Sequence, residues 1–309
     1  MPAAHYPVYL VTAQDPSWSA FWQQWTALPF WPIGQLWFLW FLLALDILAV
    51  GLWRIDPDAV LLKQLLGGRQ PTRYVAELVT VTAAGYIPLA AVFNPWERLQ
   101  FGPFSFQPSF SLVYVIYFFA GVAIGLGGIE QSLLATDGPL AHGWRTWAAG
   151  ALIGFMLWII PTGLSLNTEG ATAHLLTIFA DLGFAFSSAL SCFGVLSFFL
   201  RFFATPSPVL ETLSRNAYGM YLFHYSFVIW LQYTLLSSPL CAVGKAGIVF
   251  TGTLALSWVT TVAVSQLPIG SVILAPGARN GRCRSLGPTR TRASRDRLND
   301  WACRARTRK

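Results

Sequence analysis

The stretch of residues 213–233 places an imidazole and several phenolic hydroxyls inside an otherwise apolar run. At 100° per residue of α-helix, these polar side chains fall within about one third of the circumference, measured from His224. They are Tyr218, Tyr221, Tyr225 and Gln232. An imidazole titrates near neutral pH, so it can transfer protons or orient a bound partner. The same groups could instead hydrogen-bond neighbouring helices and hold a bundle together. The residue types leave both interpretations open.

Four further residues could line the same site. Asn216 stands where the polar stripe begins, while Trp37, Asp46 and Asp181 lie in other apolar stretches. Ionisable side chains inside a membrane are costly, and by default they mark functional interiors. The last three each have a plainer alternative. Trp37 could be an interfacial anchor, and the two carboxyl groups could be protonated or hydrogen-bonded between helices.

The elements that must position these residues are membrane helices. Of 309 residues, 55% are hydrophobic and only 11% are charged, whereas soluble domains carry about 25% charged residues. Seven stretches are long and apolar enough to span a bilayer. They are residues 34–53, 75–93, 110–129, 146–163, 174–203, 217–236 and 245–266. We therefore expect an all-α fold, a polytopic integral membrane bundle of about seven transmembrane helices.

The distribution of Lys and Arg predicts the orientation. The connections on alternate sides hold 2 and 18 of these residues, and the richer side faces the cytoplasm. We expect an outer or periplasmic segment at residues 1–33, a transmembrane region at 34–266, and a basic, disordered cytoplasmic tail at 267–309. The N-terminus would then lie outside the membrane and the C-terminus inside.

The net charge of +7 comes from the tail, because residues 279–309 hold eleven of the 20 basic residues. The rest of the chain has no basic face interleaved with aromatic residues, so we expect no nucleic-acid partner. Four cysteines stand at spacings typical of neither a disulfide framework nor a metal site. We expect no bound metal and no bound cofactor.

Two motifs in order, "LWFL" at residues 36–39 and "NAYGMYLFH" at residues 216–224, resemble the membrane-bound acyltransferase family 3. That family includes O-acyltransferases of polysaccharides, glucans and lipopolysaccharide. The late motif is matched by Asn216, Tyr218, Gly219, Tyr221, Leu222 and His224. The resemblance covers about residues 34–266.

The resemblance also predicts what is missing. Family members have about ten spans with the N-terminus inside, so seven spans with the N-terminus outside correspond to an N-terminally truncated chain. The family's early helices carry a histidine and an Arg-x-x-x-Arg motif, and neither is matched here. His5 precedes the first span, but it has no helical context in the sequence and takes over no role. The resemblance leaves open whether the chain is inactive as a fragment. The tail is either a solvated segment on anionic lipid or a product of translation in a shifted frame.

By resemblance, the chain would transfer an acetyl- or succinyl-type acyl group from acyl-CoA to a hydroxyl of a cell-surface carbohydrate, in the bacterial inner membrane. Its partners would be the lipid bilayer, the carbohydrate acceptor and acyl-CoA as donor. His224 would have a supporting catalytic role. The substrate-binding residues would be Asn216, Tyr218, Tyr221, Tyr225, Trp37, Asp46 and Asp181. The alternative is a non-enzymatic transporter or scaffold with a polar path through Asp46, Asp181 and His224.

Overall fold

The computed structural model describes residues 2–28, 34–57, 70–101, 104–126, 133–205 and 207–267. The N-terminal helices are α1 (Pro2–Thr12) and α2 (Trp18–Thr26). The long helices are α3 (Trp37–Ile55), α5 (Pro71–Val92), α6 (Ser111–Leu126), α8 (Trp144–Ser165), α9 (Ala171–Phe202), α10 (Pro208–Leu235) and α11 (Ala242–Ser265). Shorter elements are η1 (Gly34–Leu36), β1 (Leu99–Phe101), β2 (Phe104–Phe106), η2 (Pro108–Phe110) and α7 (Pro139–His142). The predicted cytoplasmic tail lies outside the described residues, except for Leu267.

Each of the seven predicted spans corresponds to one of the long helices. Within the described ranges, six helices are long and apolar enough to cross a membrane. The seventh, α10, is 28 residues long but is not among the six. Its first turns carry Glu211, Arg215 and Asn216, and its later turns carry the polar stripe, so its mean hydropathy is lower. The all-α membrane bundle is confirmed.

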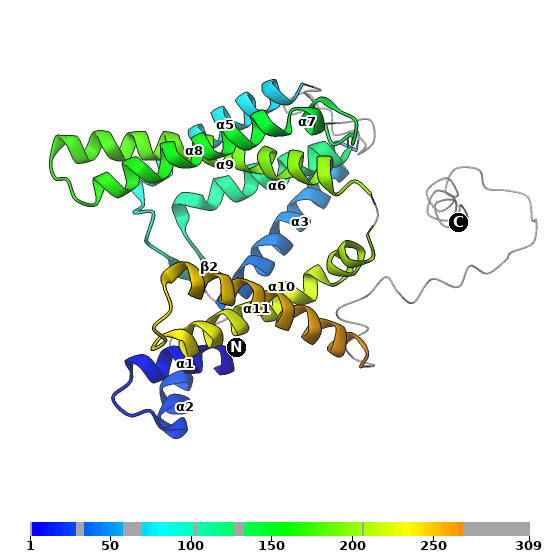
Figure 1. Cartoon of the computed structure of the whole chain (residues 1–309). Helices are drawn as coiled ribbons and strands as arrows, with labels where there is room; N and C mark the ends of the chain where they lie inside the picture. Colours follow the sequence, from blue (N-terminus) through cyan, green and yellow to red (C-terminus); the bar gives the residue numbers. More distant parts are fainter. Residues whose placement is uncertain are drawn as a thin grey trace, which may run out of the picture.

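The helices form two groups that are joined by α3 (Figure 1). In the upper part of the view, α5, α6, α8 and α9 pack together. Their core contains Tyr74, Leu78, Leu140 and Phe193, all nearly inaccessible to solvent. In the lower part, α10 crosses α11, and α1 packs against α10. The residues singled out in the sequence are therefore divided between two helix groups.

Small residues set the closest helix approaches. A Cβ atom at Gly183 of α9 would overlap the backbone carbonyl group of Leu157 in α8, and a Cβ at Gly219 of α10 would overlap the Thr261 side chain in α11. Membrane helices have no hydrophobic force that drives them together, so close backbone contact is their main source of packing energy. Gly183 therefore allows the close contact of α8 with α9, and Gly219 allows that of α10 with α11.

The N-terminal segment is folded onto α10. The Trp230 indole Nε1–H donates a hydrogen bond of 2.9 Å to the carbonyl oxygen of Ala3. The Ser17 hydroxyl accepts a hydrogen bond from the Ala20 amide and so caps α2. The segment predicted to lie at the outer surface is thus two short helices, and α1 is held against the helix that carries His224.

Candidate functional site

The two sequence motifs meet in the structure. The Tyr221 hydroxyl donates a hydrogen bond of 2.8 Å to the carbonyl oxygen of Gln35, the residue just before "LWFL". The Phe38 ring lies against the Tyr221 ring, with centroids 6.3 Å apart. Gln35 belongs to the short 3₁₀ helix η1, whose carbonyl groups are not all used within the turn. The amino-terminal end of α3 is therefore held against the middle of α10 at Tyr221.

The imidazole of His224 is oriented by its own helix. Its Nδ1 lies 2.6 Å from the carbonyl oxygen of Tyr221, three residues earlier. A carbonyl oxygen only accepts hydrogen bonds, so Nδ1 carries the proton. In the neutral ring, Nε2 is then the acceptor, with its lone pair free to take a proton or a hydrogen bond. The local backbone thus favours the tautomer in which Nε2 is the acceptor.

His224 and Tyr221 line a groove of about 880 Å³ between α10 and α11. Most of the lining is aliphatic or aromatic, and the polar members are few. They are Tyr221, His224, Gln232, Lys245, Thr253 and Ser257. The Thr253 side chain is only 8% exposed, and its hydroxyl has no hydrogen-bond partner among the described residues. The groove is an apolar channel with a small set of polar groups, as is typical of ligand sites.

Tyr225 lies one turn after Tyr221 in α10, where the N-terminal segment packs. Its ring centroid is 5.5 Å from that of His5, which is also 5.5 Å from the Trp25 ring. The expectation that His5 has no helical context is wrong, because His5 lies within α1. The helix is short and contains Pro7, so its sequence gives little signal. Burial lowers the pKa of His5 below 6.5.

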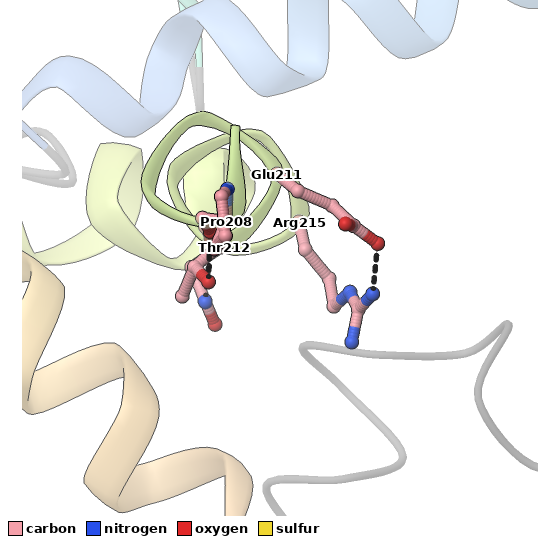
Figure 2. Close-up of polar contacts among 5 residues, drawn as sticks. Pro208, Glu211, Thr212 and Arg215 are labelled. Carbon is pink, nitrogen blue, oxygen red and sulfur yellow. Dashed lines mark hydrogen bonds and ion pairs between the residues drawn. The ribbon is translucent and has the colours of Figure 1, made fainter. Parts of the chain in front are cut away.

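The motif residue Asn216 is engaged within α10. Its side-chain amide donates a hydrogen bond of 2.7 Å to the carbonyl oxygen of Thr212. In the preceding turn, the Thr212 hydroxyl donates to the Pro208 carbonyl oxygen, and Arg215 pairs with Glu211 at 2.7 Å (Figure 2). Both members of that ion pair are about two-thirds exposed, so it adds little stability. This end of α10 is held by local contacts.

The other predicted site residues are less closely placed. Tyr218 is 48% exposed on α10. Trp37 packs against Tyr114 of α6, with ring centroids 5.8 Å apart. Asp46 is exposed on α3 and has no hydrogen bond or ion pair with any described residue. Trp37 is near the meeting point of the motifs because it adjoins Phe38, whereas Asp46 lies two to three turns along α3.

Asp181 lies in the other helix group. Its carboxyl group lies near the hydroxyl of Tyr86 in α5, and the Tyr86 ring packs on Phe184 at a centroid distance of 4.4 Å. In the part of the chain that the structure describes, no hydrogen bond or ion pair joins any two of Asp46, Asp181 and His224. The structure brings Tyr221, His224 and Tyr225 together with the "LWFL" segment, and it separates Asp181 from them.

Three polar residues of the groove, Lys245, Thr253 and Ser257, were missed by sequence reasoning. All three belong to α11, which has no motif. Only the packing of α11 against α10 shows that they line the same groove as His224 and Gln232. Among the residues described, no group of three His, Cys, Asp or Glu side chains could hold a metal ion.

Comparison with known proteins identifies the family. A family model described as an acyltransferase domain, of the acyltransferase 3 type, matches residues 2–262. The match includes the N-terminal segment, which the resemblance of residues 34–266 did not cover. No curated protein and no solved structure matches the chain. The matched region is most of the chain and contains the apolar helices, so this integral membrane protein belongs to the membrane acyltransferase family 3.

Proposed function

We propose that this protein transfers an acyl group, of acetyl or succinyl type, from acyl-CoA to a hydroxyl of a cell-surface carbohydrate. Acyl transfer needs a base for the attacking hydroxyl and donors for the carbonyl oxyanion, in a site that excludes water. The groove between α10 and α11 contains groups of both kinds in largely apolar surroundings. Family membership supports the acyl transfer in general, and the donor and acceptor are proposals.

The observation that carries the proposal is the hydrogen bond from Tyr221 to Gln35. It joins the two motif segments at the residue whose carbonyl oxygen also orients His224. Motifs far apart in sequence but adjacent in space are what a shared site requires. A purely packing role would not need the His224 Nε2 atom to remain available.

In this proposal His224 has a supporting role. Its Nε2 atom accepts a hydrogen bond from a substrate hydroxyl and holds it at the edge of the groove. The Tyr221 hydroxyl is committed to Gln35, so Tyr221 positions the ring of His224 and the start of α3. Asn216 stabilises the turn before the site by its bond to Thr212.

Two substitutions at His224 separate the roles of its ring nitrogens. His224→Asn retains a donor near Nδ1 and removes the Nε2 position, whereas His224→Gln places an amide near Nε2. The assay supplies radiolabelled acetyl-CoA or succinyl-CoA to inside-out membrane vesicles and measures label in the isolated surface polysaccharide. Loss of a hydrogen bond to a substrate predicts about tenfold or more less label for His224→Asn. If His224→Gln keeps part of the label, the Nε2 atom acts as a hydrogen-bonding group. If His224→Gln loses all of the label, the Nε2 atom transfers a proton.

The matched control is His174→Asn, at an exposed histidine of α9 outside the groove. It should leave labelling unchanged. No label from either donor with the wild-type chain would overturn the acyl-CoA proposal. If the wild-type chain transfers label and His224→Asn transfers as much, only the proposed role of His224 would be overturned.

The distribution of Lys and Arg supports the proposed orientation. We propose that the protein lies in a bacterial inner membrane, with the α8–α9 connection outside and the α9–α10 connection in the cytoplasm. An alkaline phosphatase reporter is active only outside the cytoplasm. We expect activity when it is fused after residue 168 and none when it is fused after residue 205. The reverse pattern would invert the proposed orientation.

A further inference from the structure

The groove between α10 and α11 has one charged end. Lys245 lies in the first turns of α11, and its ammonium donates a hydrogen bond of 3.2 Å to the Leu236 carbonyl oxygen at the end of α10. Among the described residues that line the groove, Lys245 is the one Lys, Arg, Asp or Glu side chain. An ammonium has three donors, so two remain for a ligand. The amino end of α11 adds the positive end of its helix dipole.

Beyond Lys245 most of the groove lining is apolar, although His224, Gln232 and Thr253 also line it. Val249, Phe250 and Leu254 line it from α11, and Val228 and Leu235 line it from α10. Twelve residues separate Lys245 from Ser257, which corresponds to about 18 Å along the helix. This is comparable to the hydrocarbon thickness of one bilayer leaflet, about 15 Å. The surface is thus a long, mostly apolar groove with a cation at one end.

We propose that this groove binds an anionic phospholipid, with its phosphate at Lys245 and one acyl chain along the apolar walls. The charge of Lys245 complements an anionic head group, and the length of the groove fits a chain that enters from one leaflet. The helices lie in a bilayer, so such lipids are present at high concentration. The same groove contains His224, so a bound lipid would lie beside the site proposed for acyl transfer, but lipid retention is measured without acyl transfer and can fail separately.

The test compares lipid retention by the full chain, purified in detergent and mixed with phosphatidylglycerol or phosphatidylcholine, by native mass spectrometry. We expect the wild-type chain to retain phosphatidylglycerol preferentially. Lys245→Gln should weaken that retention about five- to tenfold, and Lys245→Arg should restore most of it. Arg54→Gln, which removes a cation at the end of α3, is the matched control and should change nothing.

A second pair of variants tests the apolar channel. Ala246 lines the groove, whereas Val243, one turn earlier on α11, is 82% exposed and is not part of the lining. Ala246→Trp should displace phosphatidylglycerol by filling the channel, and Val243→Trp should not. Equal retention of both lipids by the wild-type chain would overturn the proposal. Equal losses of retained phosphatidylglycerol in Lys245→Gln and Arg54→Gln would also overturn it. So would a stable dimer of the chain that Ala246→Trp disrupts while the amount of bound lipid stays the same.

Discussion

The hydroxyl of Tyr221 donates to the backbone carbonyl oxygen of Gln35, 186 residues earlier in the chain. The contact ties the middle of α10 to the turn that opens α3. It also places Tyr221 between two partners, because the carbonyl oxygen of Tyr221 accepts the Nδ1–H of His224. One residue therefore connects the early motif to the imidazole of the late motif.

Tyr221→Phe should destabilise the chain modestly. It removes the hydroxyl and keeps the ring against Phe38, so the loss is that of one hydrogen bond, about 1 kcal/mol. The measurement is the thermal unfolding midpoint of the purified chain in detergent. Tyr218→Phe is the control, because Tyr218 is exposed and should not shift the midpoint. Equal midpoints for Tyr221→Phe and the wild-type chain would show that the bond contributes no net stability.

Gly219→Ala should separate α10 from α11. The added methyl group overlaps the Thr261 side chain, and overpacking of this kind costs about 1–3 kcal/mol. Thr261→Ser removes the methyl carbon that Gly219→Ala would meet first and keeps the hydroxyl that bonds to Ser257. The double variant should recover much of the unfolding free energy. Gly247→Ala is the control, since its Cβ would meet open space. A double variant no more stable than Gly219→Ala would contradict the assigned clash.

Gly183→Ala should be more damaging than Gly219→Ala. Its methyl group would overlap the backbone of Leu157, which cannot rotate away as a side chain can. Relief requires moving α8 from α9, the most extensive helix pair in the described structure. We expect a loss at or above about 3 kcal/mol in the free energy of unfolding. Gly163→Ala in α8, with no atom near its Cβ, should be neutral or slightly stabilising.

The docking of α1 on α10 should weaken below pH 6.5. Burial against Tyr225 and Trp25 lowers the pKa of His5, so the docked form binds fewer protons than the released form. Stability of the contact is then present above pH 6.5 and is lost as the pH falls below it. Amide hydrogen exchange of residues 2–12, corrected for the intrinsic pH effect, should show less protection at pH 5.5 than at pH 7.5. His5→Phe keeps an aromatic ring and should abolish the difference. Equal protection of the wild-type chain at both pH values would refute the linkage.

The sequence by itself determined the membrane helices and the family. Apolar runs longer than the bilayer core must be helical, because backbone groups have no other partners in lipid. The stripe of Tyr221, Tyr225 and His224 could also be predicted, since helical periodicity fixes which side chains share a face. The two motifs identified the family before any contact was known.

Only the tertiary structure decided which groups meet. Periodicity gives the face of a helix but not its neighbour, so Lys245 and Thr253 could not be placed beside the α10 stripe. The same limit explains Asp181, which lies near Tyr86 in the other helix group. His5 was missed because a short helix with an internal proline has almost no periodic signal. Such long-range contacts depend on how the helix surfaces fit together, and on residues such as Gly183 and Gly219, where two backbones come into contact.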